Sequence, residues 1–173
     1  MRSTFSIFFK WCEANKIEIN FSKTFILNFT PHILHFEQLK VVDDYISVIN
    51  SNRYLGVTVD NRLNWLDNVF ITSKKLNQQV FAIRKLVKIV NQNTLIMFYH
   101  AFFQSRMSYG ITIWGTSTRT SDLLLTQKRA LRIMDRKPYN FPCREIFKRL
   151  AIFTVFNLYI FDLLKYLRAW KTR

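Results

Sequence analysis

The chain contains very little glycine and proline, with three of each among 173 residues. Both residue types interrupt regular secondary structure, so their scarcity indicates long helices and strands joined by few tight turns. Cysteine is equally scarce, since Cys12 and Cys143 lie far apart and form neither a CxxC motif nor a Cys/His ligand spacing. We therefore expect two reduced thiols in an intracellular protein, in the cytoplasm or nucleus, rather than a disulfide framework.

Long hydrophobic runs are also missing. The most apolar stretch, residues 151–164, is interrupted by Asn157 and Asp162 and is too short to cross a bilayer. Near the N-terminus, Lys10 interrupts a short apolar stretch, and no small-residue cleavage site comes after it. The sequence therefore predicts neither a signal peptide nor stable membrane insertion.

No catalytic motif is recognisable. The sequence has no glycine-rich phosphate loop, HExxH motif or Ser-His-Asp order, and His32, His35 and His100 have no metal-ligand spacing. Asp43 and Asp44 form the only adjacent acidic pair, and paired carboxylates can bind magnesium. They lie between two predicted strands, however, where aspartate is an ordinary turn residue, and we favour the turn. We predict no catalytic residue, metal site or cofactor in this chain.

Apolar residues make up 49% of the chain and aromatic residues 16%, which is enough for a packed core and argues against intrinsic disorder. Residues 4–15 have helical spacing. Alternating patterns rich in β-branched and aromatic residues then predict strands at residues 17–20, 24–29, 36–42, 45–49 and 53–59, with a hairpin turn at Asp43 and Asp44.

The pattern becomes helical after residue 65. Apolar residues 3.6 positions apart line one side of a predicted helix at residues 67–90: Val69, Leu76, Val80, Ile83, Val87 and Val90. A helix at 94–108 is apolar nearly all round and is expected at the centre of a bundle. Residues 108–115 fit either a strand or, as we favour, continued helix. Further helices are predicted at about 120–136, 142–150 and 154–170.

These elements predict an α+β fold with two parts. Residues 1–65 form a small mixed or antiparallel sheet with one helix, and residues 66–173 form a basic helical bundle. Charge has a similar division, because residues 1–70 contain 7 basic and 7 acidic side chains, whereas residues 71–173 contain 19 basic and 4 acidic ones. The second part therefore carries the whole net charge of +15. Such asymmetry indicates a polyanionic partner, either nucleic acid or an anionic membrane surface.

The basic residues of the second part form a candidate binding surface. Lys128, Arg132 and Arg136 recur four residues apart on one predicted helix with Arg129 beside them, a pattern that can track a phosphate backbone. Alone it fits a solvated face better, but Lys74, Lys85 and Lys88 add to it from another helix, and together the two groups fit nucleic-acid contact and a solvated face about equally. Phe81 lies among these lysines and could stack on bases. We favour packing beneath a neighbouring helix for Phe81.

Three groups of residues, taken in order, resemble one family. The first is residues 11–20 (WCEANKIEIN) with Ser22-Lys23-Thr24. The second is residues 54–60 (YLGVTVD) with Leu63-Asn64-Trp65. The third is Tyr109-Gly110, Ile113-Trp114-Gly115, Gln127-Lys128-Arg129-Ala130 and Arg132-Ile133. In this order and spacing they resemble the reverse transcriptases of non-LTR retrotransposons, in the jockey-like and related groups, over nearly the whole chain.

The resemblance implies a role for each part. Residues 1–65 would be the end of the palm, and Lys23 would lie near the phosphates of the incoming nucleotide. Tyr54, Leu55 and Gly56 would belong to the primer-grip hairpin. The basic helices would be the thumb and the region after the thumb, holding a template–primer duplex of RNA and DNA.

The resemblance also implies a missing part. The family's catalytic Ala-Asp-Asp segment precedes the residues that match Trp11–Thr24, and nothing before Phe5 corresponds to it. We therefore expect a truncated copy that binds nucleic acid but does not polymerise alone. Magnesium is implied only for the full-length family. Two alternatives stay open: the missing N-terminal part of the polymerase is encoded upstream, or the chain is a basic helical module that binds membranes or proteins and has no polymerase ancestry.

Overall fold

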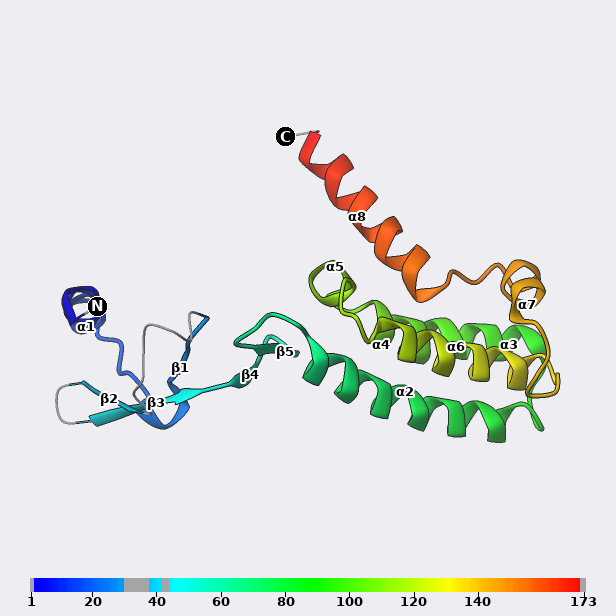
Figure 1. Ribbon diagram of the computed structural model, residues 1–173, viewed down its shortest axis with the longest axis horizontal. Coiled ribbons are helices and arrows are strands. Elements are labelled where there is room, and N and C mark those ends of the chain that lie inside the picture. The colour runs from blue at the N-terminus through cyan, green and yellow to red at the C-terminus, as the bar shows by residue number, and fades with distance from the viewer. Residues whose placement is uncertain (1, 30–37, 42–43, 172–173) are drawn as a thin grey trace. The chain divides into compact units, whose positions relative to one another are not determined.

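The computed structural model describes residues 2–29, 38–41 and 44–171 and has the predicted α+β fold (Figure 1). The chain forms two compact units. The first unit consists of Met1–Asn52 and Asp60–Leu63, and the second of Arg53–Val59 and Asn64–Arg173. The hairpin tip at Arg53–Val59 is thus part of the helical unit.

The first unit contains α1 (Arg2–Ala14), the 3₁₀ turn η1 (Phe21–Lys23) and a three-stranded mixed sheet. In that sheet β3 (Asp44–Ile49) lies between β1 (Phe25–Leu27), which is parallel to it, and β2 (Gln38–Val41), which is antiparallel. Val41 pairs with Asp44, so Asp44 belongs to the strand, while Asp43 of the predicted turn lies outside the described residues.

One predicted strand of the first unit is wrong. Residues 17–20 are irregular and lead into η1. The Asn20 carbonyl accepts a hydrogen bond from the Thr24 hydroxyl, and the Asn20 side chain accepts one from the Ser22 hydroxyl. Short polar side chains of this kind compete with strand pairing by bonding locally, and they explain the turn.

The single strand predicted at residues 53–59 is a hairpin. β4 (Ser51–Tyr54) and β5 (Val57–Asp60) flank Leu55 and Gly56, whose φ angles are 46° and 84°. Two consecutive positive φ angles are typical of the type I′ turn, whose backbone twist matches that of paired strands. Leucine rarely occupies this turn, which is why the alternating pattern gave no sign of a break.

The second unit contains the predicted helices. α2 (Leu66–Leu86), α6 (Thr120–Met134), α7 (Cys143–Arg149) and α8 (Val155–Lys171) lie within or close to the predicted ranges. The helix predicted at 94–108 is divided into α3 (Gln92–Phe98), the π-helical turn η2 (Tyr99–Gln104) and α4 (Ser105–Ser108). The chain then breaks at Tyr109 and Gly110, so the continued helix predicted there is instead the separate α5 (Ile111–Trp114).

The π-helical turn keeps one face of this segment buried. Leu95, Tyr99, Phe103 and Met107 are four residues apart, and all four are buried. In a regular α-helix this spacing would rotate each successive side chain by about 40°. The wider turn at η2 accommodates the extra residue and offsets that rotation. Met97 and Phe102 on the other side are 71% and 51% exposed, so the expected burial all round is wrong.

α2 and α6 pack side by side and form the centre of the helical unit (Figure 1). The buried apolar residues of α2 belong to the predicted stripe and are Val69, Leu76, Val80 and Ile83. Those of α6 include Leu123, Ala130, Leu131 and Met134. Trp114 of α5 and Ile146 of α7 join the same core. The helical unit therefore has one continuous apolar core.

A buried amide connects three parts of this core. The side chain of Gln127 on α6 donates hydrogen bonds to the Tyr99 hydroxyl at 2.7 Å and the Phe153 carbonyl at 2.8 Å. Its oxygen accepts one from the Val155 N–H at 3.1 Å. Because all these groups would be costly to leave unpaired, Gln127 fixes the start of α8 against α6 and η2.

Candidate nucleic-acid interface

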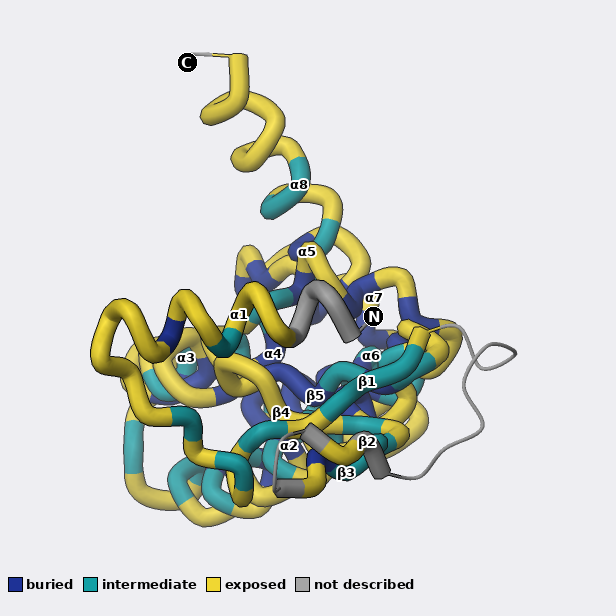
Figure 2. The backbone as a smooth tube through the Cα atoms, turned by 90° about the vertical axis from the view of Figure 1, so that its left-hand side faces the viewer, coloured by how far each residue is buried: buried dark blue, intermediate teal, exposed yellow. Residues whose placement is uncertain are grey.

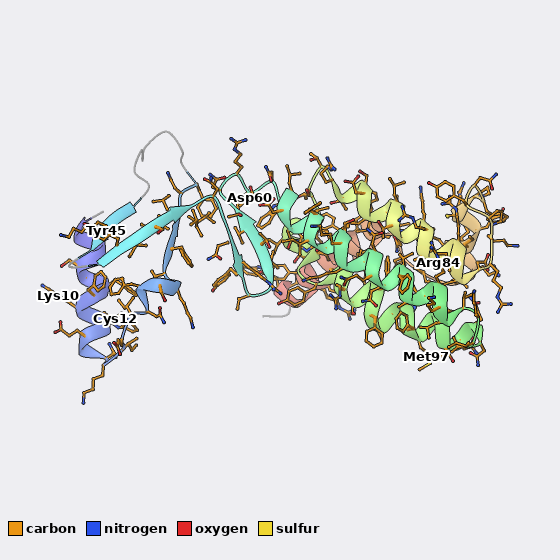
Figure 3. All side chains as sticks on the ribbon, turned by 90° about the horizontal axis from the view of Figure 1, so that it is seen from below. Lys10, Cys12, Tyr45, Asp60, Arg84 and Met97 are labelled. Atoms are coloured by element: carbon orange, nitrogen blue, oxygen red, sulfur yellow. The ribbon has the colours of Figure 1, made fainter. Side chains whose placement is uncertain are left out.

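Two open basic pockets adjoin each other on the helical unit. The first basic pocket has a volume of about 450 Å³ and lies between α2, α6 and the segment after α6. Its lining contains four basic side chains and one exposed aromatic ring: Arg84, Arg129, Arg132, Lys137 and Tyr139, with Ile133 at its base. Figure 3 labels Arg84 on α2. No acidic side chain of the described residues lines it.

The second basic pocket has a volume of about 540 Å³ and lies between α6, α7 and the start of α8. Its basic side chains are Lys128, Arg132, Arg144 and Lys148, beside apolar residues that include Leu124 and Phe147. In the part of the chain that the structure describes, no acidic side chain lines this pocket either. Since Arg132 lines both pockets, they form one surface with seven different cationic side chains.

Arg132 is held in place by its neighbours. Its Nε donates a hydrogen bond to the Phe141 carbonyl at 2.9 Å, and its guanidinium lies 5.5 Å from the centre of the Tyr139 ring. The adjacent Arg129 donates from Nη1 to the Asn77 side chain at 3.2 Å. Both cations are thus partly ordered before any ligand binds, which lowers the entropy lost on binding.

The predicted stripe on α6 is only partly correct. The structure brings Lys128, Arg129 and Arg132 together on the pocket surface. Arg136 is not on the helix, because α6 ends at Met134 and Arg136 has a φ angle of 53°. Its guanidinium instead donates to the Val87 carbonyl just after α2, at 3.0 Å.

The lysines predicted on α2 are exposed, and two of them contact aromatic rings. Lys74 Nζ lies 4.3 Å from the centre of the Phe70 ring, and Lys85 Nζ lies 5.3 Å from that of Phe81. Phe81 is 60% exposed, so the expected packing beneath a neighbouring helix is wrong. Lys88 lies just after α2 and is exposed as well.

The remaining predicted residues lie elsewhere. Tyr54 and Leu55 are exposed at the hairpin tip, where the Leu55 carbonyl accepts a 2.6 Å hydrogen bond from the Tyr109 hydroxyl. A Cβ atom on Gly56 would lie 3.2 Å from the Tyr109 ring, so this turn is closely packed. Lys23 is the exposed last residue of η1 in the first unit.

Sequence reasoning missed five residues of the two pockets: Arg84, Lys137, Tyr139, Arg144 and Lys148. Arg84 could have been found, since it lies on the same side of α2 as Phe81 and Lys88. Lys137 and Tyr139 lie in the irregular segment after α6 and have no periodicity. Arg144 and Lys148 lie four residues apart on α7 and join the surface because α7 packs against α6.

Cys143 in the second basic pocket is a buried thiol. Burial raises its pKa above the ordinary value, although the positive charges of Arg132 and Lys128 act in the opposite direction. The thiol is therefore protonated at neutral pH and is a poor nucleophile. Among the described residues, no group of three or more His, Cys, Asp or Glu side chains could hold a metal ion.

Within residues 2–29, 38–41 and 44–171, no helix combines the length and apolar character needed to cross a membrane. No family model, curated protein or solved structure matches the chain.

Proposed function

We propose that the helical unit binds nucleic acid, and that its ligand is the RNA–DNA template–primer duplex of a reverse transcriptase like those of non-LTR retrotransposons. One observation carries this proposal: the two adjoining basic pockets share Arg132, and no acidic side chain of the described residues lines either of them. Phosphates along a nucleic-acid backbone require closely spaced cations of this kind.

Several features support the binding of a backbone rather than a small anion. The pockets are open and share Arg132, so successive phosphates of one strand can occupy them. Arg129 and Arg132 are held by hydrogen bonds to the protein, which favours geometric recognition of phosphate oxygens. The role of Lys23 near a nucleotide and of Tyr54–Gly56 at a primer end belongs to the same proposal and rests on the resemblance alone.

Fluorescence anisotropy with a labelled RNA–DNA hybrid of about 16 base pairs over a salt series tests the proposal. The triple variant Arg84→Ala, Lys128→Ala, Arg144→Ala removes pocket charges without removing a hydrogen bond described above. If all three cations contact phosphates, we expect the slope of log affinity against log salt to decrease in magnitude by about 2.7, which is about 0.9 per contact.

The matched control removes three exposed lysines of the first unit, Lys10→Ala, Lys16→Ala, Lys40→Ala, and changes net charge equally. It should leave the affinity close to that of the unmodified chain. Equal losses in both triple variants, or an affinity independent of salt, would show that the pockets do not bind the backbone.

A second candidate function is association with an anionic membrane surface through α8. Phe156, Ile160, Leu164 and Leu167 form an exposed apolar stripe, and the second half of α8 is exposed all round (Figure 2). Lys165, Arg168 and Lys171 accompany this stripe, as in helices that lie in a membrane interface.

Sedimentation with vesicles tests this candidate. Vesicles containing phosphatidylserine should pellet the chain, whereas pure phosphatidylcholine vesicles should not. The double variant Leu164→Asp, Leu167→Asp should abolish pelleting. If the double variant still pellets, basic residues elsewhere in the chain are sufficient for vesicle binding, and α8 does not insert.

A further inference from the structure

The outer face of α2 alternates aromatic and basic side chains. At 100° per residue, Phe70, Lys74, Phe81, Lys85 and Lys88 fall within a sector of about 60°. All five are exposed, while the opposite face of the helix carries the buried stripe. Phe70 and Lys85 are about 22 Å apart along the axis of α2, and Lys88 lies in the turn just after the helix.

The two rings on this face are presented to solvent together with their cations. Phe70 and Phe81 are each 60% exposed, and each has the ammonium group of the lysine four residues later within 5.3 Å of its ring centre. Asp67, the only acidic residue of α2, lies at the N-terminal end of the same face and lines a pocket with Phe70 and Asp122, so the basic character is strongest from Lys74 onward. Exposed rings that alternate with lysines on one face suit a ligand with flat apolar surfaces and negative charge.

Unpaired nucleic acid has both properties. Every base offers a face that can stack on an aromatic ring, and every phosphate offers a charge to a lysine. In a duplex the base faces are covered by their neighbours, so rings along a helix face cannot stack on them. The smallest single-strand sites hold about four nucleotides, a length compatible with this face.

We propose that a single strand of nucleic acid lies along this face of α2, with bases stacked on Phe70 and Phe81 and phosphates beside Lys74, Lys85 and Lys88. The inference rests on the proposed function and specifies its ligand. Arg84 lies on α2 about 40° to one side of this face and lines the first basic pocket. The strand on α2 is therefore an unpaired extension of the duplex bound in the pockets.

Anisotropy measurements on the full chain with three probes test this inference. The probes are an oligothymidine of about 12 nucleotides, a blunt RNA–DNA hybrid of about 16 base pairs, and that hybrid with a thymidine tail of about six nucleotides. The unmodified chain should bind the tailed hybrid more tightly than the blunt one. The double variant Phe70→Ala, Phe81→Ala should lower the affinity for oligothymidine about tenfold or more and remove the advantage of the tail. Its affinity for the blunt hybrid should not change.

Two further variants control for folding and for loss of apolar surface. Phe70→Tyr, Phe81→Tyr keeps both rings and should retain the advantage of the tail. Met97→Ala, Phe102→Ala removes two exposed apolar side chains from α3 and η2 and should change no affinity.

The results separate this inference from the proposed function. If the alanine variant at Phe70 and Phe81 binds oligothymidine unchanged, or loses affinity for tailed and blunt hybrids equally, the single-strand inference is wrong. If the pocket triple variant meanwhile still weakens binding of the blunt hybrid, the proposed function stands. A chain that binds none of the three probes overturns both.

Discussion

Six residues other than glycine have positive φ angles among those described, and three of them come directly after a helix: Lys16, Arg136 and Ala151. Each has the paired backbone bonds of a Schellman ending; at Ala151, for example, the Ile152 N–H donates to the Phe147 carbonyl at 3.0 Å. Glycine is favoured at this position, but the chain has only three glycines. Other residues therefore occupy the left-handed conformation at a cost in stability.

Replacing one of these residues with glycine should stabilise the protein. We expect Ala151→Gly to raise the free energy of unfolding of the helical unit by about 0.5 to 1 kcal/mol, because glycine adopts this φ without steric cost. Urea denaturation monitored by circular dichroism measures the change. The control Ala82→Gly lies inside α2 and should destabilise by about 1 kcal/mol. A loss of stability at Ala151→Gly would contradict the argument.

The buried hydroxyl of Tyr99 should make stability depend on pH. Burial raises its pKa above the ordinary value of 10, more than the Gln127 hydrogen bond lowers it. The folded chain therefore keeps a proton that the unfolded chain releases, and stability present below pH 10 is lost as pH rises above it.

Tyr99→Phe isolates this effect from the other titrating groups. Below about pH 10 the variant should be less stable by about 1 kcal/mol, because Gln127 loses one hydrogen-bond partner. Above about pH 10 the difference should shrink, since only the unmodified chain carries the penalty of this phenol. Denaturation at about pH 8 and about pH 11 measures the difference in stability between the variant and the unmodified chain at each pH. An equal difference at the two pH values would show that folding does not raise the pKa of Tyr99.

At the scale of elements, the contact between α5 and α8 depends on a small residue. A Cβ atom on Gly115 would lie 2.4 Å from the Tyr159 ring of α8 and 2.5 Å from the Ile111 carbonyl. The backbone at Gly115 is not left-handed, so the requirement is one of space. Glycine here allows α8 to approach the end of α5.

Gly115→Ala should loosen α8. Overpacking of this kind costs about 1 to 3 kcal/mol, and we expect it to be relieved by displacement of α8. Hydrogen exchange of the amides at Leu158–Asp162 should become faster. Thr116→Ala changes the next, exposed residue and should leave exchange unaltered. Unchanged protection in Gly115→Ala would mean that the Tyr159 side chain and the end of α5 near the Ile111 carbonyl adjust without moving α8.

The sequence predicted the elements with strong periodicity and missed those that depend on a single turn. α2 and α6 were found because their buried residues recur every 3.6 positions. The hairpin at Leu55 was not found from the alternating pattern, because leucine gives no turn signal, although the resemblance implied a hairpin at Tyr54–Gly56. Nor was the π-helical turn, which adds one residue to a pattern that looks continuous. Of the basic surface, the α6 residues were predicted. Arg144 and Lys148 required knowledge of how α7 packs, and Lys137 required the course of the irregular segment after α6.

At the scale of the whole molecule, the two units differ in how many apolar side chains they bury. Every residue of the main apolar core lies in the second unit, from Val57 to Leu158. Among the described side chains of the first unit, Cys12 and Ile46 are the buried apolar residues. Stability should therefore reside in the helical unit.

A fragment of residues 53–173 should fold without the first unit. We expect cooperative thermal unfolding close to that of the full chain, together with unchanged binding of the blunt hybrid. The complementary fragment of residues 1–52 should show no cooperative transition. If the longer fragment fails to unfold cooperatively, the helical unit depends on contacts beyond its own core.

The pairing of α2 with α6 also has a consequence for synthesis. α2 ends at Leu86 and α6 at Met134, so about 48 further residues must be translated before α6 can cover its side of the α2 stripe. At about 5 to 20 residues per second this takes about 2 to 10 s. During that interval the side of the α2 stripe that α6 covers stays an apolar surface on the nascent chain, although α3, η2 and α4 emerge earlier and also pack against α2. A ribosome-associated chaperone would find its binding site there, and release of that chaperone would coincide with the emergence of α6.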